Sequence, residues 1–224
     1  MTPRATVPVV DDDSPRARWR AHTGKSAPEI AVFAATEQLL ATQPLHEVSV
    51  DAILDRSGIS RAAFYYYFSS KYDVVANLAA AALDEIIHHL DAWTGDHDAL
   101  PSEVLRSSLQ SGIKLWVDHG PLLAATIENM HSAPELGAVW IQHLERLTSL
   151  IAREIDRERG EGTAPDGVPA EAVAGVLVWA SERLLYLGLR GVDDALPSVE
   201  AAGEALLDLW SAAIYGSADF SQRP

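Results

Sequence analysis

Hydrophobic positions along this chain recur with the period of an α-helix. Ile30, Phe33 and Leu40 follow helical spacing after a helix-start signature at Ser26, and Pro44 ends the run. Later stretches rich in Ala and Leu keep this period, and sustained two-residue alternation is missing. The pattern therefore predicts an all-α fold without a β-sheet.

Helix-start residues and Gly or Pro breaks divide the pattern into nine expected helices. Their ranges are 27–43, 49–57, 60–66, 70–94, 101–119, 121–131, 134–160, 169–190 and 197–215. The early helices are short and the later ones long and amphipathic, which predicts one domain over 26–72 and a second over 73–224. Residues 1–25 are rich in Pro, Arg and Asp, and we expect this arm to be disordered.

Residues 49–68 contain a helix, a tight turn at Gly58 and a second short helix. This is the layout of a helix-turn-helix, whose second helix enters the major groove of DNA. Apolar side chains on both helices can close a small core that fixes the interhelix angle: Ile53, Leu54, Ile59 and Phe64. The segment therefore predicts DNA binding.

Three consecutive tyrosines follow Phe64, and a helix of seven residues cannot bury all of them. Because successive helical residues are rotated by about 100°, Tyr67 should face inward with Phe64 and Phe68. Tyr65 and Tyr66 should then point outward, where their hydroxyls can reach phosphates and base edges.

Basic residues accompany this motif. Arg61 opens the second helix, and Lys71 lies at the start of the next one, where free backbone N–H groups favour a phosphate contact. Arg16, Arg18 and Arg20 alternate ahead of the first helix. Such an arm can bind a minor groove or phosphates, and a solvated tail explains the pattern equally well.

The run from Gly58 to Lys71 resembles the signature of the tetracycline-repressor (TetR/AcrR) family of transcriptional regulators. The resemblance implies an N-terminal three-helix DNA-binding domain and a C-terminal helical domain for ligand binding and dimerisation. Ala63 stands where family members commonly carry Thr, so Ser60 or Arg61 would replace the contact of that hydroxyl.

The same resemblance implies roles for individual side chains at the DNA. Ser49 and Lys71 would contact phosphates, and Tyr65 would clamp the backbone. Arg61 and Tyr66 would lie nearest the bases. The candidate DNA-binding residues are Ser49, Ser60, Arg61, Tyr65, Tyr66 and Lys71.

Five of the six tryptophans follow residue 72, and periodicity alone favours a core role for them. Residues 181–186 and 209–216, however, are similar to the EthR-like subgroup of the family, whose helices enclose an aromatic-lined effector pocket. The resemblance implies an apolar or amphipathic ligand bound by Trp116, Trp140, Ser181, Tyr186 and Trp210.

The last two expected helices are too apolar to face only water. Pairing with their copies would form a four-helix interface in a homodimer, and two DNA-binding domains would then meet a palindromic operator. We therefore expect a repressor that a small molecule releases from double-stranded DNA.

An enzyme is the competing function. Two Glu-x-x-His pairs, Glu85/His88 and Glu128/His131, lie on different expected helices, as in di-metal carboxylate bundles. The further Glu ligands of such a centre are not evident, and no Gly-rich phosphate loop or nucleophile elbow is present. The regulator interpretation is preferred; it requires no cofactor and no metal.

Charge sharpens the division into domains. The chain carries 17 basic and 32 acidic residues, a formal net charge of −15. Residues 14–72 hold seven basic and five acidic side chains, whereas 73–224 hold nine basic and 24 acidic ones, so only the first third can approach a polyanion without general repulsion.

The absence of cysteine excludes disulfides and Cys-containing zinc sites. No signal peptide or long apolar span is evident, so we expect a cytoplasmic protein without a membrane segment.

Overall fold

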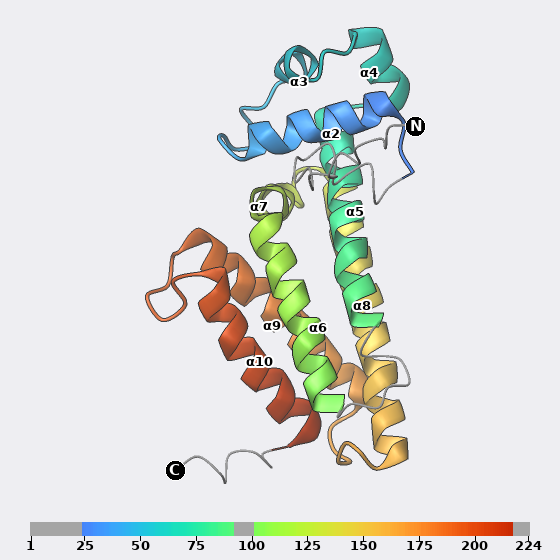
Figure 1. The fold of residues 1–224 in the computed structure, drawn as a ribbon, viewed down its shortest axis with the longest axis vertical. Coiled ribbons are helices and arrows are strands. Elements are labelled where there is room, and N and C mark those ends of the chain that lie inside the picture. Colours follow the sequence, from blue (N-terminus) through green and yellow to red (C-terminus); the bar gives the residue numbers. More distant parts are fainter. Residues whose placement is uncertain (1–23, 92–100, 217–224) are drawn as a thin grey trace, which may run out of the picture. The chain divides into compact units, whose positions relative to one another are not determined.

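The computed structural model describes residues 24–91 and 101–216, and every regular element in these ranges is an α-helix (Figure 1). The helices are α2 (Ala27–Leu40), α3 (Val50–Ser57), α4 (Arg61–Tyr67), α5 (Lys71–Asp91), α6 (Pro101–Asp118), α7 (Gly120–Asn129), α8 (Pro134–Glu161), α9 (Ala170–Arg190) and α10 (Val199–Tyr215). The all-α class is confirmed, and the helix ends lie within three residues of the expected ones, apart from the end of α5, whose expected residues 92–94 lie outside the described ranges. The Arg16–Arg20 arm and Trp93 fall outside the described residues.

The chain divides into two compact units between Val74 and Val75, which we call the first and the second unit. The boundary expected from the sequence lay between residues 72 and 73. Helix α5 supplies residues to both units, because it begins at Lys71 and continues to Asp91.

Local capping explains where the helices of the first unit begin. The backbone N–H of Ser26 donates to Glu29 Oε2 at 2.9 Å, the reciprocal contact of a capping box. The hydroxyls of Ser49 and Ser60 accept from the N–H groups of the third residues after them and so cap α3 and α4. Gly58 ends α3 with φ +73°, a left-handed conformation that favours glycine.

Aromatic packing forms the core of the first unit. The ring of Phe68 lies 5.6 Å from that of Phe33 and 5.7 Å from that of Phe64, measured between centroids. All three side chains are buried, as is Ile53 of α3. This cluster holds α2, α3 and α4 together and fixes which face of α4 points outward.

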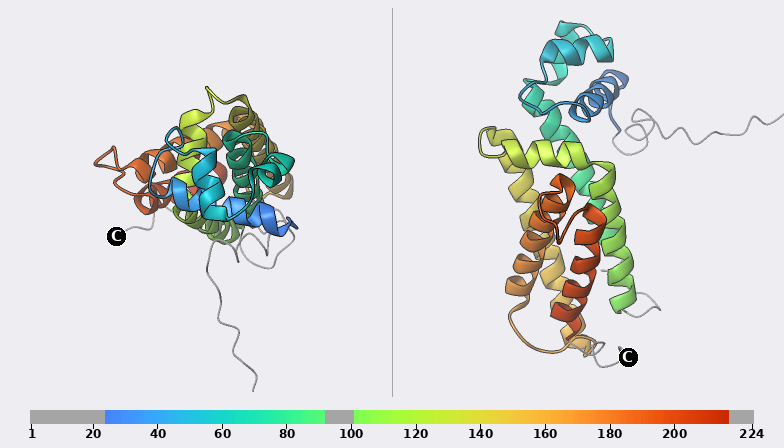
Figure 2. Two further views of the ribbon diagram at one scale, coloured as in Figure 1. Left: turned by 90° about the horizontal axis from the view of Figure 1, so that it is seen from above. Right: turned by 90° about the vertical axis from the view of Figure 1, so that its left-hand side faces the viewer.

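In the second unit, α8 packs on α9, α9 on α10, and α10 on α6, while α7 runs across the ends of these longer helices (Figure 2). Arg146 Nη1 donates to Asp84 Oδ1 at 2.7 Å and links α8 to α5. A glycine permits the close approach where α9 ends. A Cβ on Gly188 would lie 2.5 Å from the carbonyl oxygen of Ser198, so no larger residue fits there without a backbone shift.

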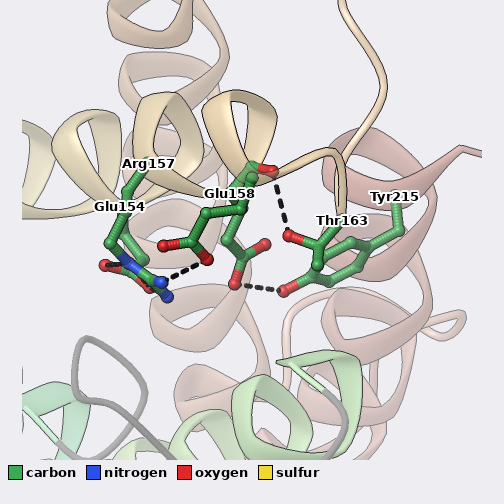
Figure 3. Close-up of polar contacts among 6 residues, drawn as sticks. Glu154, Arg157, Glu158, Thr163 and Tyr215 are labelled. Carbon is green, nitrogen blue, oxygen red and sulfur yellow. Dashed lines mark hydrogen bonds and ion pairs between the residues drawn. The ribbon is translucent and has the colours of Figure 1, made fainter.

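A buried glutamate ties the end of α8 to α10 (Figure 3). Glu158 is fully buried, and its Oε1 accepts from the Tyr215 hydroxyl at 3.1 Å. Its backbone carbonyl accepts from Thr163 Oγ1 at 2.9 Å. Nearby, Arg157 Nε donates to Glu154 Oε1 at 3.0 Å within α8. These contacts join the end of α8 to its neighbours and thereby stabilise the second unit.

Candidate functional site

Helix α4 presents aromatic side chains outward in the way that its phase predicts, with one exception. Tyr66 is 81% exposed and Tyr65 50% exposed, whereas Phe64 and Phe68 are buried. The prediction that Tyr67 is buried is wrong, because its side chain is 37% exposed. The helix ends at Tyr67 and the backbone of Phe68 is extended, so Phe68 fills the inner space. The ring of Tyr67 packs edge-on against Tyr66 instead.

Three further candidates carry polar groups: Ser60 and Arg61 at the start of α4, and Ser49 at the start of α3. The Arg61 guanidinium pairs with the Asp51 carboxylate of α3, and both side chains are more than half exposed. An exposed pair of this kind is weak and can exchange for a phosphate. Ser49 and Ser60 use their oxygens as cap acceptors, and each hydroxyl keeps its own proton for donation. These side chains can therefore supply the polar contacts of a DNA surface.

Lys71 has partners that the sequence did not indicate. Its ammonium donates to the backbone carbonyls of Leu45, His46 and Val48 at 2.8, 3.2 and 2.7 Å, and it lies 5.3 Å from the ring centroid of Tyr72. An ammonium can donate three hydrogen bonds, and three carbonyl oxygens accept them here. Burial lowers the pKa of this side chain. The contacts favour a structural role over the expected phosphate contact, since they tie α5 to the loop before α3.

The second unit contains a cavity of about 90 Å³ between five helices. Its lining is Leu83, Ile86, Leu90, Ser108, Leu109, Gly112, Ile113, Trp116, Trp140, His143, Leu144, Leu147, Ile151, Val178, Ser181, Glu182, Leu185, Leu206 and Trp210. Four of the five residues expected at a ligand site are among them: Trp116, Trp140, Ser181 and Trp210. The rings of Trp116 and Trp140 meet edge to face, with centroids 6.2 Å apart. An apolar cavity of this kind suits an aromatic or aliphatic ligand.

Tyr186 does not line this cavity. Its hydroxyl donates to Glu128 Oε1 at 3.2 Å, and the Arg183 guanidinium lies 5.5 Å from its ring centroid. Burial and the Glu128 carboxylate raise the pKa of the Tyr186 hydroxyl. Arg190 also pairs with Glu128. Tyr186 thus belongs to a polar network apart from the cavity lining.

Polar atoms without hydrogen-bond partners are the feature of the cavity that sequence reasoning missed. They are Nε2 of His143, Oε2 of Glu182 and Nε1 of Trp140, on side chains that are all more than nine-tenths buried. By contrast, Trp210 Nε1 donates to Ser181 Oγ at 2.9 Å. Of these residues, Glu182 was a candidate for a polar ligand contact, whereas His143 was not; helical phase could have located His143, because it lies three positions after Trp140.

Burial controls the charge of the two ionisable groups that line the cavity. It lowers the pKa of His143 to about 4, with a smaller contribution from the Arg146 charge, so the imidazole is neutral at pH 7. It raises the pKa of Glu182, and Arg183 opposes this effect. The Arg183 Nε lies 3.7 Å from Glu182 Oε2, although the arginine side chain itself is 56% exposed.

Helix α9 carries an apolar face that the described residues, 24–91 and 101–216, leave exposed. Val176 is 68% exposed and Trp179 is exposed too, as is Leu209 on α10. Among the described helices, α9 alone is long and apolar enough to cross a membrane by length and composition, and 33% of its apolar stretch is buried. Such a face requires a cover.

The two Glu-x-x-His pairs do not form a metal centre in the part of the chain that the structure describes, where no cluster of three or more His, Asp or Glu side chains could hold an ion. Glu128 instead accepts from Tyr186 and pairs with Arg190. Its partner in the motif, His131, is exposed. Geometry therefore gives the enzyme interpretation no support.

Two family models match the chain. The one described as bacterial regulatory proteins of the tetR family matches residues 32–78, and the one described as the C-terminal domain of the transcriptional regulator EthR matches residues 105–216. The HTH-type transcriptional regulator EthR of Mycolicibacterium smegmatis is 30% identical over 206 residues, which cover 91% of this chain and 94% of that protein. EthR of Mycobacterium tuberculosis H37Rv is 29% identical over 207 residues, covering 90% and 94%.

Solved structures show the same fold at lower identity. A putative TetR-family transcriptional regulator from Syntrophomonas wolfei superposes with a TM-score of 0.69 and 18% identity, covering 86% of this chain and 97% of that one. A structure described as a SmeT–triclosan complex gives a TM-score of 0.70 and 20% identity, covering 86% and 94%. SmeT is described elsewhere as the repressor of a multidrug efflux pump of Stenotrophomonas maltophilia.

Proposed function

We propose that this chain, which belongs to the TetR family of transcriptional regulators and to its EthR-like branch, leaves its operator when a small molecule fills the cavity of the second unit. Family membership makes the chain a DNA-binding regulator and gives the enzyme alternative no support. The observation that carries the proposal is that the two units have different features. One presents exposed tyrosines on a helix-turn-helix, and the other contains an apolar cavity.

Helix α4 is the proposed major-groove helix. Tyr66 has the most exposed side chain of its three tyrosines, and we assign it and Arg61 to the base edges. Tyr65 and the hydroxyls of Ser49 and Ser60 would contact phosphates. Lys71 is not among the proposed DNA-contacting residues, because its ammonium already has three carbonyl partners.

A homodimer is the proposed cover for the apolar face of α9 and α10. A membrane would also cover such a face, but α9 packs on α8 and α10 within a helical unit and lines the cavity. A second copy, related by two-fold symmetry, would bury Val176, Trp179 and Leu209 and present two α4 helices to a palindromic operator. We propose accordingly that the protein is cytoplasmic.

Helix α5 is the proposed route from ligand to DNA. Its first turn includes Lys71, which anchors the loop before α3, and its later turns place Leu83, Ile86 and Leu90 in the cavity wall. A ligand that displaces these side chains would favour one orientation of α5 over another. The two recognition helices would then no longer match successive major grooves, which lie about 34 Å apart.

Binding to selected DNA tests the proposal. An operator is first obtained by in vitro selection from a random DNA pool, and affinity is then measured by fluorescence anisotropy. Tyr66→Ala should weaken binding by roughly tenfold or more and change the preferred sequence at one position. Val168→Ala, which truncates an exposed side chain in a loop of the second unit, is the control and should bind as the unaltered protein does. Equal affinity and preference for both variants would refute the assignment of α4.

A further inference from the structure

The cavity combines an apolar wall with polar atoms that the protein leaves without hydrogen bonds. Three such atoms belong to lining residues: Glu182 Oε2, His143 Nε2 and Trp140 Nε1. Buried polar atoms in folded proteins nearly always have partners, and those that do not call for an explanation. A ligand that supplies the partners is one such explanation.

We propose that the effector is an amphipathic amine, whose apolar body fills the cavity and whose protonated nitrogen donates a hydrogen bond to the Glu182 carboxylate. This inference rests on the proposed function, because it names the chemistry of the molecule that enters the same cavity. It goes beyond the apolar or amphipathic ligand expected from the sequence, since it specifies the head group and its charge.

The charges around the cavity favour a cation. No Lys or Arg is among the lining residues, and Glu182 is the one acidic residue among them. The His143 imidazole is neutral at pH 7, because burial lowers its pKa to about 4. Arg183, the counter-charge closest in sequence, is half exposed, lies over the ring of Tyr186 and does not line the cavity. An ammonium group would therefore meet a buried carboxylate without a hydrogen-bond donor on Oε2, whose ion-pair partner Arg183 lies outside the cavity lining.

The same arrangement disfavours an acidic ligand. A carboxylate head placed in this cavity would stand near Glu182 without a lining cation to neutralise it. The Trp140 N–H could donate to such a head, but one neutral donor does not replace the lost hydration of a charge. Trp140 and His143 serve better as partners for an uncharged acceptor elsewhere on the amine.

A matched series of probes tests this inference. 4-Phenylbutylamine, 4-phenylbutanol and 4-phenylbutanoate share one apolar body and differ in the head group. Their dissociation constants for the full chain are measured by titration calorimetry at pH 7. We expect the amine to bind roughly tenfold or more tightly than the alcohol, because a hydrogen bond to a charged group is stronger than a neutral one, and the carboxylate to bind most weakly.

Two variants on α9 assign the preference to one side chain. Glu182→Gln keeps the shape of the side chain and removes its charge, so it should reduce the amine-to-alcohol ratio to about one. Glu171→Gln removes the same charge from an exposed position on the same helix and should leave the ratio unchanged. The order of the three probes on the unaltered protein requires no variant, so a folding defect in Glu182→Gln would leave the inference testable.

The possible outcomes separate this inference from the proposed function. If the alcohol or the carboxylate binds as tightly as the amine, the amine inference is refuted, while operator release by any bound probe still supports the effector cavity. An amine preference that survives in Glu182→Gln would also refute it. If no probe binds, or if bound probes leave operator affinity unchanged, the proposed function itself fails.

Discussion

Mild acid should destabilise the second unit through one buried side chain, His143. Burial holds its pKa at about 4 in the folded protein, whereas the unfolded chain has the ordinary value of 6.5. Between these two values the unfolded state binds more protons than the folded state, so the free energy of unfolding falls as the pH falls. The contribution of this group is intact above pH 6.5, declines through the window and is constant again below pH 4.

The size of this effect follows from the two pKa values. One pKa unit corresponds to about 1.4 kcal/mol, so the complete loss would be about 3 kcal/mol. About 2 kcal/mol of that loss falls between pH 7 and pH 5. The imidazole is almost entirely buried, so solvent screens this contribution little.

Urea unfolding followed by tryptophan fluorescence is the appropriate assay, because five of the six tryptophans belong to the second unit. Many carboxylates titrate in the same range, so the useful quantity is a difference between two proteins. His143→Phe keeps a ring and removes the titration, and the unaltered protein should lose about 2 kcal/mol more than this variant between pH 7 and pH 5. His131→Phe, at an exposed position, should behave like the unaltered protein. Equal losses in the unaltered protein and His143→Phe would show that the folded imidazole protonates freely.

Three further substitutions test other parts of the structure. Lys71→Met should destabilise the protein by about 2 kcal/mol in urea unfolding, because it removes charged hydrogen bonds to three carbonyls. Lys114→Met, the control, removes only a surface ion pair and should lower the free energy of unfolding by less than about 0.5 kcal/mol. Gly112→Leu should fill the cavity, since an added Cβ there meets no atom within 4 Å. Titration calorimetry should then show that the probes no longer bind, and fluorescence anisotropy should show weaker operator binding. Asp51→Asn should raise DNA affinity and steepen its salt dependence by about one charge, because it frees Arg61 on α4. Asp55→Asn, at another exposed position on α3, should change the affinity less.

Most of the fold was predictable because its determinants are local. Ser26, Ser49 and Ser60 stand at the N-caps of α2, α3 and α4, within one residue of the expected helix starts, and Gly58 adopts the left-handed turn. Such signals act within one helical turn, so the sequence around each residue is sufficient to identify them. The order and lengths of the helices followed from these signals and from the hydrophobic period.

In the first unit, the candidate site was predictable only where helical phase decides exposure. Phase correctly placed Tyr66 outward on α4, but it failed for Tyr67 because the helix ends there and Phe68 takes the inner position. The partners of Lys71 were unpredictable for a different reason: they are carbonyls that lie 23 to 26 residues earlier in the chain. Contacts at such separations are set by tertiary packing, and no local pattern contains them.

The polar residues of the cavity show why a ligand site conflicts with stability. A well-packed core would either supply hydrogen-bond partners for Glu182 and His143 or have apolar residues in their place. Each polar atom left buried without a partner lowers the free energy of unfolding by about 1–3 kcal/mol. A ligand recovers that free energy only in the conformation whose cavity fits it, so the same atoms make its affinity differ between conformations. That difference is the quantity a ligand needs in order to shift an equilibrium. In the proposed mechanism, this free energy would favour one orientation of α5 over another and would thereby change the geometry of DNA binding.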